Sequence, residues 1–337
     1  MKVHGDPAGI LDLIEAFRRS KTMFTAVRLG VFDKLEEEPR TSGQLAAELQ
    51  LNPGALERLL NGCVGLKLLR REGDEYHNTP AASRYLTTSS PDTLAGYIRY
   101  SDASLFHLWS HLDDAVREGT NRWTQTFGSR NALFDHYFRD DLAASSFLGG
   151  MHGFGQIGSR VIVRAFDLGG FHHLVDLGGA TGHLAIAACE AYPNLRATVL
   201  DLPLVERFAR PYIEESSVAN RVSFAARDFF NEDLPSGDLY ALGRILHDWD
   251  EPKIIALLTK VNRSLDSGGG LLIAETLLND DKGGPVYTLM QDLNMLVCTD
   301  GRERTAAEYQ SLLRNAGFTE VRFHRTNLLV DAILAVK

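Results

Sequence analysis

Residues 173–193, "HLVDLGGATGHLAIAACEAYP", decide the fold of this 337-residue chain. The apolar, strand-like run "HLVDL" leads into a glycine-rich turn, and the helix-like run "HLAIAACEAYP" follows that turn. A glycine turn between a strand and a helix lets a ligand approach the backbone near the positive end of the helix dipole. The stretch therefore predicts a strand, a ligand-binding turn and a helix at the start of an α/β domain.

The same alternation continues to the end of the chain. Further strands are predicted at residues 197–201, 222–228, 239–246 and 270–275, followed by a hairpin from 320–326 into 327–337. Helical patterns separate the earlier strands, which is typical of a mostly parallel sheet covered on both faces. We therefore expect a Rossmann-like α/β domain with an antiparallel last strand, whose ligands lie at the carboxyl ends of the parallel strands.

The amino-acid composition limits the kinds of partner that the chain is expected to bind. The chain is 44% hydrophobic and 23% charged, as in soluble globular proteins, and its net charge of -9 disfavours attraction to nucleic acid. It shows no signal-peptide core and no run near the roughly 18 apolar residues of a membrane span. Cys63, Cys189 and Cys298 form no CxxC pair, which favours buried thiols. We expect a cytoplasmic protein without nucleic-acid or membrane partners.

The first 165 residues have a different pattern. Residues 1–93 contain amphipathic helices, a helix-turn-helix segment and a two-stranded wing, the outline of a winged helix. Its second helix, 53–66, offers only Arg58 for DNA, so a dimerisation domain is favoured over a DNA-binding domain. Residues 94–165 read as a helical, aromatic-rich linker that contributes to a substrate pocket, and residues 166–337 form the α/β domain.

Three acidic residues end successive strands and point to a nucleoside cofactor. Asp201 can accept hydrogen bonds from two ribose hydroxyls, and Asp228 with Phe229 suits an adenine amino group and an adenine face. Asp176 stands before the first glycine, where it suits the amino group of a methionine moiety. The glycine spacing also departs from the GxGxxG of nicotinamide-binding turns, so S-adenosylmethionine is favoured over NAD.

The segment "ALGRILHDWDEP", residues 241–252, ends the fourth strand of this domain with polar groups. Because adjacent parallel strands bring their carboxyl ends together, His247 and Glu275 are expected to be neighbours. A histidine there can take a proton from a substrate hydroxyl while a carboxylate fixes its tautomer. Glu303, just before a capping box at 305–308, is a second carboxylate on the same sheet face. Taken alone, these residues also fit a turn histidine, a surface acid and a solvated loop charge.

Together these motifs resemble a known family. The stretches "DLGGATG", "RDFF", "LHDWDEPK", "GGGLLIAE" and "GRERTAAEY" are similar to those of S-adenosylmethionine-dependent O-methyltransferases of the plant caffeate and vertebrate acetylserotonin type. The resemblance covers nearly the whole chain. It implies a homodimer formed through the N-terminal domain and metal-independent methyl transfer to a phenolic or enolic hydroxyl of a small aromatic acceptor. It also implies S-adenosyl-L-methionine as methyl donor and S-adenosyl-L-homocysteine as product.

The resemblance assigns roles to individual residues. It implies that His247 is the catalytic base, flanked by Glu275 and Glu303. It implies these cofactor contacts: Gly178, Asp201, Asp228, Phe229, Arg244, Tyr137 and Phe154.

The acetylserotonin members are the more similar ones, through "HLDDAVREG", "LNMLV" and "VDAILAVK". Asn294 matches a substrate-contacting asparagine of these enzymes. Cys298 stands in place of a substrate-contacting glutamine, which argues against N-acetylserotonin itself as acceptor. Ala180 replaces the usual middle glycine of the cofactor turn, a change that is tolerated unless φ is positive there.

Other functions fit parts of the pattern. The winged helix also suits a DNA-binding regulator that responds to a small molecule, the glycine turn also suits a nicotinamide-dependent dehydrogenase, and a methyltransferase fold can be reused for different chemistry. Asp248 and Asp250 could indicate a magnesium site, but Asp250 is better placed to cap the helix that Pro252 helps to start. The sequence pattern assigns no role to Asp248.

Overall fold

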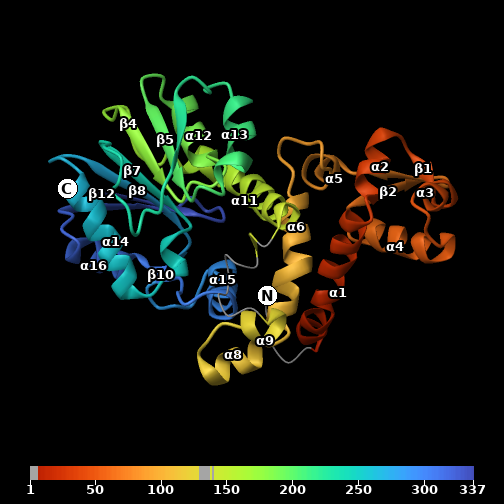
Figure 1. Cartoon of the computed structure of the whole chain (residues 1–337). Coiled ribbons are helices and arrows are strands. Elements are labelled where there is room, and N and C mark those ends of the chain that lie inside the picture. Colours follow the sequence, from red (N-terminus) through yellow and green to blue (C-terminus); the bar gives the residue numbers. More distant parts are fainter. Residues whose placement is uncertain (1–6, 129–136, 139) are drawn as a thin grey trace. The chain divides into compact units, whose positions relative to one another are not determined.

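The computed structural model describes residues 7–128, 137–138 and 140–337 (Figure 1). The chain divides into two compact units, Met1–Ser104 and Leu105–Lys337. The three-part division expected from the sequence, at 1–93, 94–165 and 166–337, stays a prediction.

The first unit is mostly helical and carries a small antiparallel sheet. Its elements are α1 (Ala8–Arg28), α2 (Val31–Glu37), β1 (Arg40–Thr41), α3 (Ser42–Glu48), α4 (Pro53–Gly65), β2 (Leu69–Glu72), β3 (Glu75–Asn78), α5 (Pro80–Tyr85), α6 (Ala95–Tyr100) and the π-helical segment η1 (Ser101–Leu105). The strand order is β1-β3-β2, with antiparallel pairs. Gly30 has φ of 75° and separates α1 from α2. The order α3-α4-β2-β3 gives the expected helix-helix-wing arrangement.

Helix α1 leaves an apolar surface exposed in this unit. Side chains toward its C-terminal end, such as Ala26 and Val27, are buried in the core of the unit. Large apolar side chains nearer its N-terminus are each more than half exposed: Ile10, Leu11, Leu13, Ile14 and Phe17. A cluster of this kind on one helix is typical of a protein-protein contact rather than of free surface.

The second unit contains the α/β domain. Its helices are α7 (Phe106–Trp109), α8 (Leu112–Glu118), α9 (Trp123–Phe127), α11 (Asp141–Ile162), α12 (His183–Ala191), α13 (Glu206–Glu214), the 3-10 turn η2 (Leu246–Asp248), α14 (Glu251–Ser264), α15 (Val286–Cys298) and α16 (Ala306–Asn315). Its strands are β4 (His173–Leu177), β5 (Arg196–Asp201), β6 (Val222–Ala226), β7 (Leu239–Gly243), β8 (Gly270–Glu275), β9 (Leu277–Leu278), β10 (Arg304–Thr305), β11 (Glu320–His324) and β12 (Asp331–Val336).

Seven of these strands form one twisted sheet in the order β11-β12-β8-β7-β4-β5-β6. All neighbours from β8 to β6 are parallel, and β12 runs antiparallel to both β8 and β11. The predicted Rossmann-like sheet with an antiparallel last strand is therefore confirmed. The order reverses between β4 and β7, and a ligand site is expected at the carboxyl ends of those two strands.

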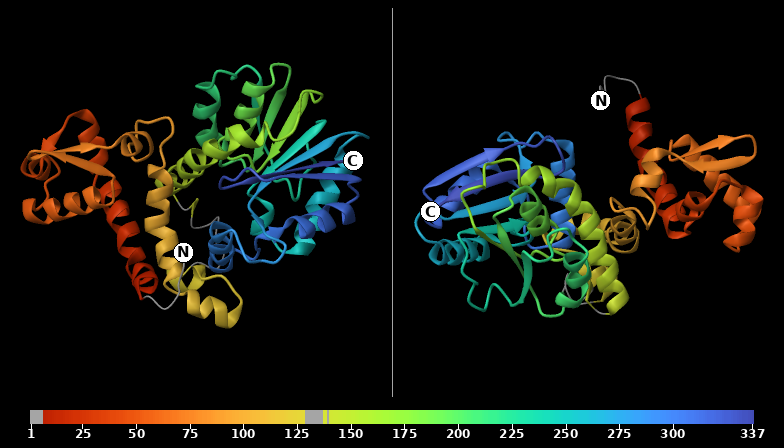
Figure 2. Two further views of the ribbon diagram at one scale, coloured as in Figure 1. Left: turned by 180° about the vertical axis from the view of Figure 1, so that it is seen from behind. Right: turned by 90° about the horizontal axis from the view of Figure 1, so that it is seen from above.

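Helices cover both faces of the sheet (Figures 1 and 2). Helices α14 and α16 pack on one face, and α11 and α12 pack together on the other. The apolar core on the α14 side is continuous and includes two tyrosines, Tyr240 and Tyr309. Its members on the sheet include Val175, Leu200, Leu242, Leu271 and Ile333, all fully buried. Burying side chains of this size fixes the strand ends, because each contributes about 1.5 to 3 kcal/mol.

Several predicted strands are too long. The strands predicted at 222–228 and 320–326 each end two residues earlier, at Ala226 and His324, and the difference is largest at 239–246. The apolar run 239–246 predicted a strand up to Leu246, whereas β7 ends at Gly243. Arg244 adopts φ of 58°, in the left-handed region, so the extended backbone cannot continue. The chain then enters η2, which carries His247. This sharp change of direction brings the histidine over the end of β8 instead of leaving it further along β7.

The predicted helix starts are confirmed. Asp250 accepts a hydrogen bond from the Lys253 backbone N–H and caps α14, and Thr305 with Glu308 forms the capping box of α16. Among the helices that the structure describes, none has the length and apolar character needed to cross a membrane. The three cysteines are buried and free, as expected.

Candidate active site

The glycine turn after β4 is held in an unusual backbone conformation. Gly178 and Gly182 have φ of 68° and 82°, and Ala180 has φ of 47°. The φ of Ala180 is therefore positive, the case in which alanine is unfavourable at this position. The left-handed region costs an alanine about 1 kcal/mol. A Cβ on Gly178 would lie 2.5 Å from Cδ1 of Ile245, so a larger residue here would displace that side chain and would also be strained by the positive φ.

His152, which sequence reasoning missed, holds this turn from helix α11. Its Nδ1 lies 2.8 Å from the Thr181 hydroxyl, and its Nε2 lies 2.7 Å from the Gln156 amide nitrogen. The ring also stacks on Tyr212 of α13, with centroids 3.9 Å apart. Burial lowers the pKa of His152 to about 3, so the ring is neutral at physiological pH. Nothing in the local sequence marks this histidine, because two of its partners, Thr181 and Tyr212, lie on other parts of the chain.

Two carboxylates flank the turn. Asp201, at the end of β5, accepts hydrogen bonds from the backbone N–H groups of Ala180 and Leu202, at 2.9 and 2.8 Å. Burial raises the pKa of Asp201 to about 6. Asp176 lies beneath the turn, where a Cβ on Gly179 would come 2.7 Å from its Oδ2. That oxygen has no hydrogen-bond partner among the described residues, and burial raises the pKa of Asp176 to about 7.

Phe229 lies next to the same turn. A Cβ on Gly178 would be 3.5 Å from its ring, and the ring packs on Phe230 with centroids 4.7 Å apart. Asp228 is partly exposed. Its burial disfavours the charge, but hydrogen bonds from the Asn231 amide and the Phe230 backbone keep the pKa of Asp228 below its ordinary value. Phe229 and Asp228, the residues predicted to contact the adenine, thus present an aromatic ring and an ionised carboxylate near the turn.

The two linker aromatics make different contacts. The Arg244 guanidinium lies over the ring of Phe154 of α11, with 4.7 Å between its Cζ and the ring centroid. Tyr137 stacks on Phe147, with centroids 4.0 Å apart, and meets Trp123 edge to face. Tyr137 thus packs against other aromatic side chains of the helical segment.

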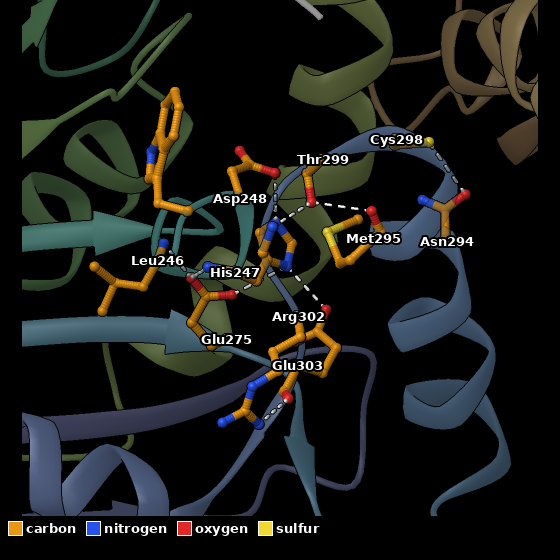
Figure 3. A network of polar contacts seen from close by, with 12 residues as sticks. Leu246, His247, Asp248, Glu275, Asn294, Met295, Cys298, Thr299, Arg302 and Glu303 are labelled. Atoms are coloured by element: carbon orange, nitrogen blue, oxygen red, sulfur yellow. Dashed lines mark hydrogen bonds and ion pairs between the residues drawn. The ribbon is translucent and has the colours of Figure 1, made fainter. Parts of the chain in front are cut away.

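The second group of candidate residues surrounds His247 (Figure 3). Its Nδ1 lies 2.8 Å from Glu303 Oε1 and 3.3 Å from Glu275 Oε2. On the other side of the ring, Nε2 lies 3.7 Å from Asp248 Oδ1. Glu275 also accepts hydrogen bonds from the Leu246 and His247 backbone N–H groups, at 2.8 and 3.4 Å. The two glutamates expected beside His247 therefore both face the same nitrogen.

Burial makes the electrostatics of this group strong. His247 is 3% exposed, and the two glutamate side chains are fully buried. Burial disfavours the imidazolium, but the charges of the three surrounding carboxylates outweigh it and raise the pKa of His247 to about 9. Burial also raises the pKa of Glu275, against the opposing charge of the histidine. A hydrogen on Nδ1, held between carboxylates, leaves Nε2 as the position that can gain or lose a proton.

The same three side chains could in principle hold a cation. One ligand atom each from His247, Glu275 and Glu303 lies within 4.8 Å of the others. The 2.8 Å contact between Nδ1 and Glu303 is, however, the length of a charge-assisted hydrogen bond. A metal on Nδ1 would have to replace that hydrogen bond, since one nitrogen lone pair cannot serve both partners.

The expected acceptor-side residues lie on α15. Asn294 Oδ1 accepts a hydrogen bond from the Trp109 indole N–H at 2.8 Å, and the Cys298 thiol points to the same oxygen at 3.7 Å. The Trp123 indole donates to the Cys298 carbonyl at 2.7 Å. The Asn294 oxygen is thus already engaged, and among the described residues no group accepts a hydrogen bond from its amide N–H₂. Trp109 carried no distinguishing signal in the sequence beyond its aromatic character.

Comparison with known proteins identifies the protein family. Residues 109–319 match the model of the O-methyltransferase domain, and residues 11–88 match the O-methyltransferase dimerisation domain. The chain belongs to the O-methyltransferase family. Acetylserotonin O-methyltransferase of Gallus gallus is 43% identical over 338 residues, covering 98% of this chain and 97% of that protein.

Solved structures agree with this O-methyltransferase assignment. Human N-acetylserotonin methyltransferase in complex with SAM is similar with a TM-score of 0.94 and 38% identity, over 100% of this chain and 99% of that one. PigF with SAH is similar with a TM-score of 0.88 and 28% identity, over 98% and 100% of the two chains. This O-methyltransferase is therefore of the acetylserotonin type and uses S-adenosyl-L-methionine, so the nicotinamide alternative is set aside.

Proposed function

We propose that this O-methyltransferase methylates a hydroxyl of a small aromatic acceptor, phenolic or enolic, without a metal, and that His247 is the general base. The observation that carries the proposal is the contact of 2.8 Å between His247 Nδ1 and Glu303. Because the carboxylates hold the Nδ1 hydrogen, Nε2 has its lone pair directed away from them.

His247 does the proton chemistry in this proposal. Nε2 removes the acceptor's hydroxyl proton, and Glu275 and Glu303 stabilise the imidazolium that forms. When bound, S-adenosylmethionine supplies a methyl group on a positively charged sulfur, which the deprotonated oxygen can attack. The remaining contribution of the protein is to orient the reacting groups. Asp248, 3.7 Å from Nε2, lies on the side where the hydroxyl would approach.

The residues around the glycine turn fit this cofactor. Asp201 is suited to the ribose hydroxyls, Asp228 and Phe229 to the adenine, and Gly178 to a close approach of the ligand to the backbone. Arg244 over Phe154 is suited to the methionine carboxylate. Tyr137 would act through the aromatic stack that it forms with Phe147.

The acceptor class follows from the polarity of α15. With the Asn294 oxygen taken by Trp109, the amide N–H₂ favours an acceptor that carries a hydrogen-bond-accepting oxygen, such as a carbonyl. The buried Cys298 is a weak hydrogen-bonding group, and burial raises its pKa, so the thiol stays neutral. N-acetylserotonin is accordingly one candidate within a wider set of aromatic hydroxyl compounds.

The exposed apolar residues of α1 support a homodimer formed through the N-terminal domain. They lie in or beside the segment that matches the dimerisation domain, and a second copy would cover them.

A panel assay tests the proposal. Labelled S-adenosylmethionine is incubated with phenols and enols that do or do not carry a carbonyl, with wild-type protein and His247→Asn. We expect transfer to at least one acceptor, loss of about 1000-fold or more in the variant, and unchanged S-adenosylhomocysteine affinity. Turnover of the variant near the wild-type rate would refute the base. Loss of activity in EDTA that magnesium restores would refute the metal-free mechanism.

A further inference from the structure

The loop of residues 299–304, "TDGRER", packs against the turn that carries His247 (Figure 3). It leaves the C-terminal end of α15 and leads into β10, which pairs with β9 beyond the end of β8. The loop contacts the histidine segment in three separate ways, and only one of them, the Glu303 carboxylate, belongs to the group already described.

The first additional contact is at Gly301. A Cβ on this glycine would lie 2.1 Å from the His247 carbonyl oxygen and 2.6 Å from the Trp249 backbone nitrogen. Both atoms are backbone, so no side-chain rotation could relieve the clash. Any larger residue at 301 would have to displace the η2 turn by about 1.4 Å, from 2.1 Å to an ordinary contact distance of about 3.5 Å.

The second additional contact comes from Arg304, which is 1% exposed. Its guanidinium donates to the Leu246 and Trp249 carbonyls, each at 3.3 Å. These carbonyls lie immediately before and two residues after His247. The arginine therefore holds both ends of the turn.

The loop is itself fixed to α15. The Glu303 backbone N–H donates to Asp292 Oδ1 at 2.9 Å, and Gly301 N–H donates to the Thr299 hydroxyl at 3.1 Å. Thr299 in turn donates to the Met295 carbonyl at 3.1 Å. Helix α15 also carries Asn294, so the acceptor-side helix and the histidine turn are joined by one short, hydrogen-bonded loop.

We propose that residues 299–304 are a brace that sets the position of His247 relative to α15, with Gly301 and Asp292 as its positioning residues. Neither residue touches the reacting groups: Gly301 acts through the backbone of η2, and Asp292 acts through the backbone of Glu303. The proposal rests on the proposed role of His247 as base.

Gly301→Ala is the most direct test, with Gly170→Ala as its matched control. Gly170 lies in the same unit, has no atom within 4 Å of an added Cβ and has no positive φ, so alanine fits there. A shift of about 1 Å at a catalytic group can cost 100-fold in rate, and we expect a kcat loss of that order for Gly301→Ala. Gly170→Ala should keep wild-type kcat, and S-adenosylhomocysteine affinity should stay within about threefold in both, because the cofactor turn is untouched.

Asp292 provides an independent test through a conservative pair of substitutions. An asparagine at this position would still accept the Glu303 N–H through its amide oxygen, whereas an alanine would offer no acceptor. We therefore expect Asp292→Asn to keep near wild-type kcat and Asp292→Ala to lose about tenfold, as for the loss of one hydrogen bond to a charged group. Equal kcat in the two variants, whether high or low, would overturn the role of Asp292 as hydrogen-bond acceptor.

A readout that needs no acceptor comes from histidine NMR with ¹³C-labelled imidazole. His247→Asn identifies the His247 signal, and its pH titration is followed in each variant with S-adenosylhomocysteine absent. If the brace holds the ring against Glu303, the His247 pKa should fall by about one unit or more in Gly301→Ala and Asp292→Ala. An unchanged titration in folded Gly301→Ala or Asp292→Ala overturns the brace.

If Gly301→Ala does not fold, the Asp292 pair still decides the question. If His247→Asn retains turnover, the proposed base fails while the titrations still report whether the loop positions the ring.

Discussion

Replacing Glu303 with glutamine removes one negative charge at 2.8 Å from His247 Nδ1 and leaves the shape of the site nearly unchanged. Three carboxylates together raise the pKa of His247 from 6.5 to about 9. Glu303 is the nearest of them, and an opposite charge at this range changes a pKa by about 1 to 3 units. We therefore expect Glu303→Gln to lower the His247 pKa by about 1 to 2 units.

The sign of the resulting pH dependence follows from the proton that His247 must accept. The base is active when neutral, so kcat/KM should rise with pH until the free-enzyme pKa of His247, about 9, is passed. In Glu303→Gln the same rise should be complete about 1 to 2 pH units lower, and the plateau should be lower because a weaker, less firmly oriented base remains. Initial rates of labelled methyl transfer between pH 6 and 10 measure both effects.

Two features make this comparison specific. The acceptor's own hydroxyl ionisation is common to both enzymes, so it cancels in the difference between their profiles. Glu190→Gln, an exposed change of the same chemistry on α12, should leave the profile where it is. Superimposable profiles for wild type and Glu303→Gln would refute the argument that this carboxylate sets the basicity of the histidine.

Three further changes have expected outcomes. Ala180→Gly relieves the left-handed alanine at φ of 47° and should add about 1 kcal/mol to the free energy of unfolding, seen as a higher Tm; a lower Tm would contradict the strain. Ile14→Asp places a charge within the exposed apolar residues of α1, so light scattering should detect monomer where the wild type gives dimer, and an intact dimer would exclude this surface from the interface. Trp109→Phe frees the Asn294 oxygen, so the preference for carbonyl-bearing acceptors should fall by about tenfold in kcat/KM ratios; an unchanged ratio would contradict the role of the indole.

Features set by short-range chemistry could be predicted from the sequence. The caps at Asp250 and at Thr305 with Glu308 depend on residues three positions apart, and the structure has both. His247 and Glu275 are close together because β7 and β8 are adjacent parallel strands connected by a single helix. Parallel pairing of this kind follows from the alternation of strands and helices, so the placement needs no knowledge of the side chains.

Features set by a single backbone angle could not be predicted. The run 239–246 is apolar and strand-like throughout, yet the left-handed φ of Arg244 ends β7 three residues early. Arginine has no intrinsic preference for that region, so the conformation is imposed by the surrounding packing. The chain then enters η2, where His247 Nδ1 meets both glutamates.

Contacts between loops were the least predictable part of the site. In the sequence, Gly301 looks like an ordinary turn glycine. A side chain is excluded there by the His247 carbonyl, which lies more than fifty residues earlier in the chain, so no local pattern indicates it. Asp292 reads as a polar residue of an amphipathic helix, and its partner is a backbone N–H, which no side-chain pattern can reveal. Side-chain chemistry suggests which groups could react, whereas the distance between them depends on backbone contacts of this kind. Substitutions at Gly301 and Asp292 should therefore change the rate of transfer more than they change the affinity for either ligand.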